Sequence, residues 1–148
     1  MKAYTILLTF LVLLNSCTDE NDDYSYGGTK LKIETLTIPH RWELSKTKEV
    51  KTIRNQVDYY DLGLDGELDF QQGQVLLVNM GEKTDDGDSI KSVKVFDINS
   101  STVVAYIKYQ TPGKGCKVGE VITHPFKLIW IPSRKNVLVS EKTVKKEC

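Results

Sequence analysis

Apolar and polar residues alternate along much of the chain after residue 28, with the period of two that is typical of β-strands. Lys30–Glu34 alternates, and Leu36–Ile38 resumes the alternation on a shifted phase, which predicts a β-bulge between them. A hairpin is predicted around a three-residue loop at 99–101. Short strands bounded by Gly, Pro or Asn are predicted at 49–53, 90–98, 102–110, 120–123, 126–131 and 136–143.

Two segments depart from this alternation. Gln74–Met80 is a nearly continuous apolar run, which predicts a strand buried on both faces. Asn55 is a good N-cap, so Gln56–Leu62 is predicted to be a short helix. Its core-facing residues should be Val57, Tyr60 and Leu64. The pattern predicts a mainly β fold, an antiparallel β-sandwich or partly open barrel with one short helix, in which residues 29–148 form a single domain.

The first residues have the character of an export signal. A lysine at position 2 precedes the apolar run Ala3–Leu14, which is too short to cross a bilayer that needs roughly 20 apolar residues. Leu14-Asn15-Ser16-Cys17 resembles a lipobox, the motif at which a bacterial lipoprotein is lipidated on Cys and cut before it. We therefore expect residues 1–16 to be a lipoprotein signal peptide and Cys17 to carry acyl chains such as palmitate. The alternative is an ordinary signal peptide that is cut elsewhere.

An acidic segment follows Cys17. Four of the six residues 18–23 are Asp or Glu and none is apolar, so residues 17–28 are predicted to be a solvated tether behind the lipid. Such an acidic run resembles the signal that sends some Gram-negative lipoproteins to the cell surface, although a plain spacer is the alternative. The expected location is the outer membrane of a Gram-negative cell, with exposure on its surface favoured.

Charge and composition exclude several classes of function. Residues 17–148 contain 19 Lys and Arg against 20 Asp and Glu, and the lysines are scattered, so no nucleic-acid partner is expected. No GxSxG, HExxH or phosphate-binding glycine loop occurs. We expect no enzymatic activity and no cofactor.

The three cysteines divide by position. With Cys17 lipidated, Cys116 and Cys148 remain in an oxidising compartment, where a disulfide between them is one outcome and two separate thiols the other.

Metal ligands are sparse. The two histidines, His40 and His124, each neighbour a proline and have no ligand spacing around them. The acidic turn Thr84-Asp85-Asp86-Gly87-Asp88 lacks the glycine position and the bidentate glutamate of an EF-hand loop. We therefore expect no metal site, and interpret the turn as solvated.

Several motifs between Leu68 and Pro132 resemble the C-terminal domain of the protease complex subunit PrcB family. They are Asp69-Phe70, Val75-Leu76-Leu77-Val78, Gly81-Glu82-Lys83-Thr84, Ser89-Ile90, Pro112-Gly113, Thr123-His124-Pro125-Phe126 and Ile131-Pro132. The family is named for a lipoprotein that associates with a surface protease, so the resemblance implies binding of a protein partner without catalysis. The family turn Thr-Gly-Gly-Tyr is replaced here by Thr84–Asp88, which departs from the contact loop of chagasin-like protease inhibitors.

The resulting hypothesis is a membrane-anchored lipoprotein that acts as a protein-binding accessory module for a surface protease. Its expected contacts are three loops: Thr84–Asp88, Pro112–Lys117 with Pro112 and Gly113 at its start, and Thr123–Pro125 with His124 and Pro125. The alternatives are a protease inhibitor and a carbohydrate-binding module that stacks sugars on Trp42 and the pair Tyr59-Tyr60.

Overall fold

A computed structural model of the chain describes residues 27–37 and 45–148. The predicted signal peptide, Cys17, most of the tether, His40 and Trp42 lie outside these residues. The described elements are β1 (Thr29–Lys30), β2 (Glu34–Thr35), β3 (Glu49–Ile53), α1 (Gln56–Asp61), β4 (Gln74–Asn79), β5 (Ser89–Asp97), β6 (Thr102–Pro112), β7 (Phe126–Ile131) and β8 (Asn136–Lys146).

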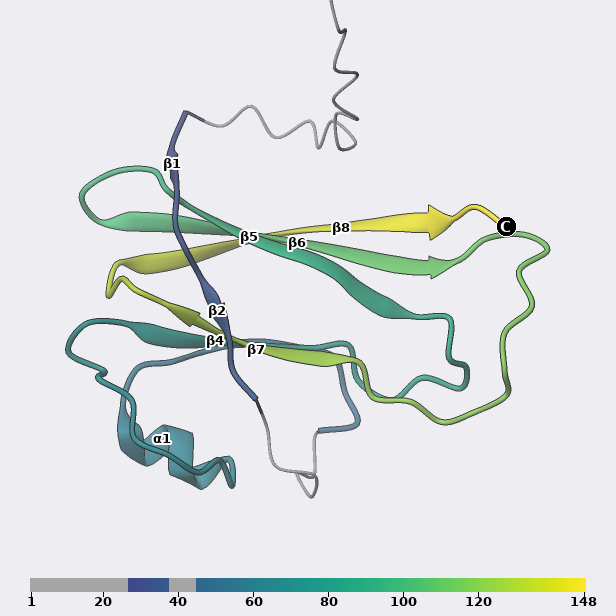
Figure 1. Cartoon of the computed structure of the whole chain (residues 1–148), viewed down its shortest axis with the longest axis horizontal. Helices are drawn as coiled ribbons and strands as arrows, with labels where there is room; N and C mark the ends of the chain where they lie inside the picture. The colour runs from purple at the N-terminus through teal and green to yellow at the C-terminus, as the bar shows by residue number, and fades with distance from the viewer. Residues whose placement is uncertain (1–26, 38–44) are drawn as a thin grey trace, which may run out of the picture.

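The strands form two four-stranded sheets that face each other (Figure 1), with the orders β1-β5-β6-β8 and β2-β7-β4-β3. The predicted mainly β fold with one short helix is confirmed, and it takes the form of a sandwich. One strand pair differs from the expected antiparallel arrangement, because β6 and β8 are parallel in continuous register from Thr102↔Asn136 to Pro112↔Lys146. The chain crosses to the other sheet as β7 after leaving β6, and therefore returns to β8 in the direction of β6.

The N-terminal segment closes one side of the sandwich. The single bulged strand predicted from Lys30 onward is wrong, because β1 pairs with β5 in one sheet and β2 pairs with β7 in the other. Leu31 and Ile33, which lie between these short strands, pack against the core. Their alternation therefore reflects a crossing between sheets rather than one continuous strand.

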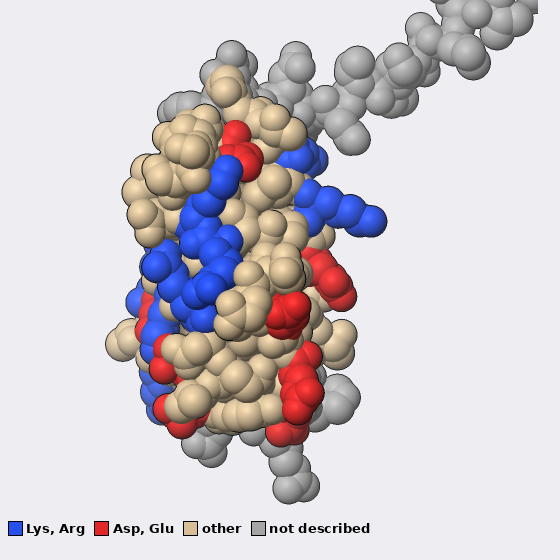
Figure 2. Space-filling model, turned by 90° about the vertical axis from the view of Figure 1, so that its left-hand side faces the viewer, with Lys and Arg blue, Asp and Glu red and all other residues tan. Residues whose placement is uncertain are grey.

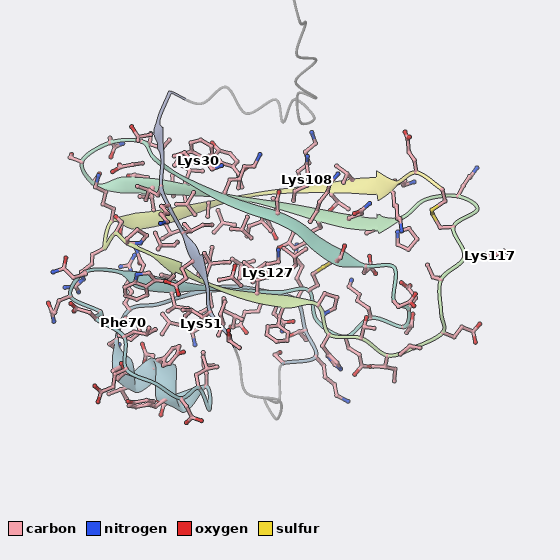
Figure 3. All side chains as sticks on the ribbon, in the orientation of Figure 1. Lys30, Lys51, Phe70, Lys108, Lys117 and Lys127 are labelled. Carbon is pink, nitrogen blue, oxygen red and sulfur yellow. A yellow bond between two sulfur atoms is a disulfide. The ribbon has the colours of Figure 1, made fainter. Side chains whose placement is uncertain are left out.

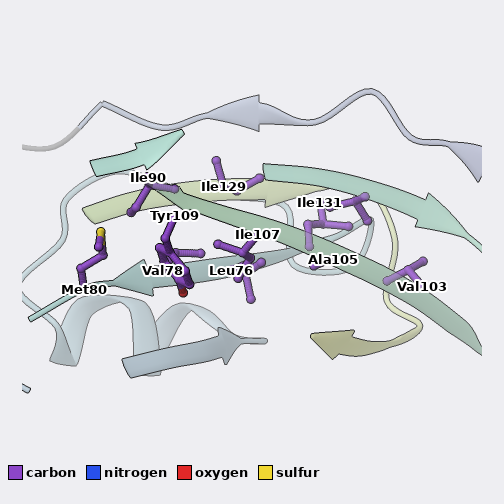
Figure 4. Packing of buried hydrophobic residues seen from close by; sticks show 11 residues of the cluster. Leu76, Val78, Met80, Ile90, Val103, Ala105, Ile107, Tyr109, Ile129 and Ile131 are labelled. Carbon is purple, nitrogen blue, oxygen red and sulfur yellow. The ribbon is translucent and has the colours of Figure 1, made fainter. Parts of the chain in front are cut away.

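Two apolar clusters stabilise the sandwich. The larger lies between the sheets (Figure 4) and contains Leu76 and Val78 of β4 together with residues of β5, β6 and β7. The smaller lies on the outer face of the second sheet and contains Val75 and Leu77 of β4. Every residue of β4 is buried, which confirms the strand predicted to be buried on both faces.

The predicted helix is confirmed, but not the face it buries. The Asn55 side chain accepts a hydrogen bond from the backbone N–H of Asp58, as an N-cap does. Tyr59 is buried against Phe70, whereas Val57 and Tyr60 are 67% and 47% exposed. Leu64 is buried as predicted. A six-residue helix has too few turns for its apolar spacing to identify the buried face.

Candidate partner-binding surface

The structure brings the three predicted contact loops together at one end of the sandwich. Thr84–Asp88 precedes the start of β5, Pro112–Lys117 begins with the last residue of β6, and Thr123–Pro125 precedes β7. Ser89 and Gln110 are partners in the β5–β6 ladder, so the first two loops leave the same end of one sheet. Figure 1 shows these loops at the end where the C-terminus lies. We call the three loops and the intervening residues 118–122 the partner-binding surface.

Hydrogen bonds join the acidic turn to the segment before β7. The carboxylate of Asp86 accepts from the backbone N–H of Gly119 at 2.8 Å, and the Thr123 hydroxyl donates to the carbonyl of Asp85 at 2.7 Å. Lys83 and Thr123 form an isolated antiparallel bridge. The strand predicted at Glu120–Thr123 is therefore wrong, because only its last residue forms a β-bridge, and that bridge is isolated.

A close approach at Gly87 packs the acidic turn onto the second loop. A β-carbon at this position would lie 2.3 Å from Cγ of Pro112 and 2.7 Å from Cγ1 of Val118. These distances are well below van der Waals contact, so any side chain at residue 87 would push the loops apart. Gly87 therefore allows the acidic turn to pack closely against Pro112 and Val118.

A disulfide joins the second loop to the end of β8. Cys116 and Cys148 are bonded, with their Cα atoms 5.3 Å apart (Figure 3, yellow sulfur atoms near the labelled Lys117). Beside it is an open pocket of about 260 Å³. Its lining comprises Asp86, Gly87, Pro112, Cys116, Lys117, Val118, Lys146 and Cys148.

Three apolar side chains of this surface face solvent. Val118, Val121 and Ile122 are 40%, 54% and 66% exposed, respectively. Exposed apolar residues that are grouped rather than scattered often mark a protein-binding site. Sequence reasoning missed the exposure of Val121 and Ile122 because a strand was predicted over 120–123, and apolar residues of a predicted strand are expected to face the core.

Two polar atoms in this region lack hydrogen-bond partners. Within the described ranges, Oδ1 of Asp88 and Nδ1 of His124 are buried side-chain atoms without one. The other ring nitrogen of His124 lies 4.0 Å from Oε2 of Glu82. A buried polar atom without a hydrogen-bond partner lowers the stability of a fold by about 1–3 kcal/mol.

The part of the chain that the structure describes holds no group of three or more His, Cys, Asp or Glu residues able to bind a metal ion together. No helix in 27–37 or 45–148 is both long and apolar enough to span a membrane. The predicted sugar-stacking pair is separated, because Tyr59 is buried in the core and only Tyr60 is exposed.

Comparison with known proteins finds a similarity over part of the chain. No curated protein and no solved structure matches the chain. A family model described as PrcB C-terminal matches residues 74–132, about two fifths of the chain. The matched part runs from the start of β4 to just after β7 and includes all three contact loops. Over these residues the chain is similar to the PrcB C-terminal family, and the resemblance indicated by its sequence motifs is confirmed.

Proposed function

We propose that the protein is a non-enzymatic accessory module of the cell envelope, anchored by lipid on Cys17, which binds a protein partner through the partner-binding surface. The observation that carries the proposal is the meeting of three loops, with Val118, Val121 and Ile122 exposed, at one end of a rigid sandwich. Rigid strands with specific loops are a common design for binding modules. The PrcB C-terminal match supports a protease as the partner.

The binding surface is tested by a pair of matched variants. Val121→Ser with Ile122→Ser removes two exposed apolar side chains from the surface, and Leu138→Ser with Val139→Ser removes two that are 57% and 42% exposed on β8. Tagged full-length chains are cross-linked in cells and purified from membranes. We expect a cross-linked partner whose recovery falls at least tenfold with the first variant and is unchanged with the second. Equal recovery by both variants would contradict the proposal.

The anchor is tested separately through Cys17. Cys17→Ser removes the thiol that would be acylated, and cleavage of a lipobox before residue 17 depends on that acylation. We expect the variant to accumulate as the uncut precursor and to incorporate no labelled palmitate. Normal cleavage with normal membrane retention would refute lipidation at this residue.

A protease inhibitor is a second candidate, favoured by the grouping of the loops at one end of a β-sandwich. It departs from chagasin-like inhibitors because Thr84–Asp88 replaces the Thr-Gly-Gly-Tyr turn. Purified protein should then slow cysteine or serine proteases at micromolar concentration. An accessory module should bind its protease and leave the rate of peptide cleavage intact.

A further inference from the structure

The N-terminal segment joins the fold at the end opposite the partner-binding surface. Thr29 of β1 pairs with Asp97, the last residue of β5, whereas β5 begins beside the acidic turn. Figure 3 shows Lys30 of β1 at one end of the molecule and Lys117 at the other. The nine residues of β5 separate the two ends by about 30 Å, at roughly 3.3 Å for each residue.

Basic side chains gather at this N-terminal end. The ammonium group of Lys135 binds the carboxylate of Asp97 at 2.6 Å and the carbonyl of Asn99 at 2.8 Å, so it adjoins the strand that receives β1. Arg134 precedes it in the β7–β8 turn, and Arg54 follows β3. We call Arg54, Arg134 and Lys135 the cationic cluster. Figure 2 views this end directly and shows a zone of Lys and Arg side chains, with Asp and Glu concentrated below it.

A buried amide holds Arg54 in place. The Gln74 side chain is fully buried, and its oxygen accepts from Nε of Arg54 at 3.1 Å. Its nitrogen donates to the carbonyls of Ser133 and Lys135, both at 2.7 Å, and so fixes the β7–β8 turn as well. The guanidinium is therefore oriented before any ligand arrives, which reduces the entropy that binding would cost.

The two arginines keep their positive charge unopposed. Arg54 also donates to the side-chain oxygen of Asn136 at 3.4 Å, and Arg134 donates to that of Gln71 at 3.4 Å. These acceptors are neutral amides, and neither guanidinium forms an ion pair with any described residue. A planar guanidinium with free N–H groups suits phosphate oxygens, which it can bind through two parallel hydrogen bonds.

We propose that the cationic cluster binds the phosphates of anionic lipid headgroups, so that this end faces the membrane and the partner-binding surface points away. The inference rests on the proposed lipid anchor at Cys17. Residues 17–28 could extend at most about 40 Å, so the cluster remains within reach of the bilayer to which Cys17 would be fixed. Because the tether joins the fold at this end, the arginines meet the lipid headgroups more often than the loops at the opposite end do. A negatively charged leaflet attracts each nearby Lys or Arg enough to strengthen binding about fivefold.

The test uses the unlipidated chain from residue 17 with Cys17→Ser, because the apolar segment 1–16 would itself enter a bilayer. Co-sedimentation is measured with vesicles of phosphatidylglycerol and phosphatidylcholine, and with vesicles of phosphatidylcholine alone. Arg54→Gln with Arg134→Gln removes two charges from the cluster. Lys91→Gln with Lys145→Gln removes two exposed charges near the other end and keeps the net charge of the two variants equal.

We expect the arginine variant to lower the partition coefficient on anionic vesicles roughly 25-fold, and the lysine variant to lower it less than threefold. Binding should weaken steeply with salt, and be negligible on phosphatidylcholine alone. Equal losses in both variants would overturn the proposal in favour of diffuse attraction. Full competition by 10 mM inorganic phosphate at constant ionic strength would also overturn it, in favour of a soluble phosphate ligand. Neither result bears on acylation of Cys17 or on partner capture, which the earlier experiments measure.

Discussion

At the residue scale, Gln74 is a buried polar side chain in a segment that sequence reasoning predicted to be an apolar strand. Its amide makes three hydrogen bonds that join β4, Arg54 and the β7–β8 turn while being fully buried. Gln74→Leu would fill the space but leave two carbonyls without their donor. We expect a loss of about 2–4 kcal/mol in the free energy of unfolding, measured with urea.

The exposed Gln71 provides the matched control for this substitution. Gln71→Leu removes an amide whose one partner among residues 27–37 and 45–148 is the exposed Arg134, and should change the free energy of unfolding by no more than about 0.5 kcal/mol. Similar effects of both substitutions would mean that burial of the Gln74 amide contributes nothing specific.

Asn55 and Gln74 mark the boundary of what the sequence could predict for single residues. The N-cap role of Asn55 was predictable because its partner lies three residues away, within one helical turn. The role of Gln74 was not, because its amide partners lie 59 and 61 residues further along the chain. Short-range chemistry is visible in a sequence, whereas pairing over such separations depends on topology.

At the element scale, an ionic group connects the two sheets on the side away from β1. Glu141 of β8 binds the ammonium group of Lys48 at 2.7 Å and accepts from the hydroxyl of Tyr109 on β6. Burial alone would raise the pKa of Glu141, but the hydrogen bonds from Lys48 and Tyr109 outweigh it and lower the pKa. Burial raises the pKa of Tyr109, and its bond to Glu141 raises it further.

These shifts give opposite pH dependences at the two extremes. Because the pKa of Glu141 is lower in the folded chain, its contribution to stability is present above about pH 4.5 and is lost as the pH falls below that value. We expect Glu141→Gln to lower the urea midpoint at pH 7, with the difference from the unmodified chain shrinking towards pH 3. The raised pKa of Tyr109 predicts a loss of stability above about pH 10, which Tyr109→Phe should reduce.

The exposed Glu67 serves as the control in the acid range. Glu67→Gln should leave the urea midpoint and its pH dependence close to those of the unmodified chain. A constant difference for Glu141→Gln between pH 7 and pH 3 would contradict the ionic origin of the effect.

The elements differ in how far their patterns predicted them. β4 was predictable as a doubly buried strand because an apolar run between glycines leaves few other interpretations. The segments 30–38 and 120–123 were wrongly predicted as strands, because a residue pattern indicates which side chains could be buried and not which backbone segments pair. The parallel placement of β8 beside β6 was likewise invisible, since it depends on β7 lying in the other sheet.

At the scale of the whole molecule, the sandwich has two ends with different chemistry. One end receives the N-terminal segment and carries the cationic cluster, and the other carries the three loops and the disulfide. For a lipid-anchored protein this arrangement would present the loops away from the bilayer. The loops themselves were predictable from turn residues, whereas their meeting at one end required the strand order.

The disulfide between Cys116 and Cys148 stabilises the fold at the end that carries the three loops. The two cysteines are 32 residues apart in the sequence, and a disulfide that closes a loop of this size stabilises a fold by about 3–4 kcal/mol in the chain-entropy model. We expect Cys116→Ser with Cys148→Ser to lower the free energy of unfolding by that amount. Dithiothreitol should have the same effect on the unmodified chain and none on the variant.

Because the disulfide lies at the loop end, its loss should affect the partner-binding surface more than the cationic cluster. The disulfide holds Cys116 to the end of β8 beside Val118, whereas the cationic cluster is held by Gln74 and the β7–β8 turn. Below its unfolding transition, the serine variant should therefore lose partner recovery at least fivefold and keep its binding to anionic vesicles within twofold. Parallel loss of both activities in a folded variant, checked by circular dichroism, would mean that the two ends are coupled through the sandwich rather than independently stabilised.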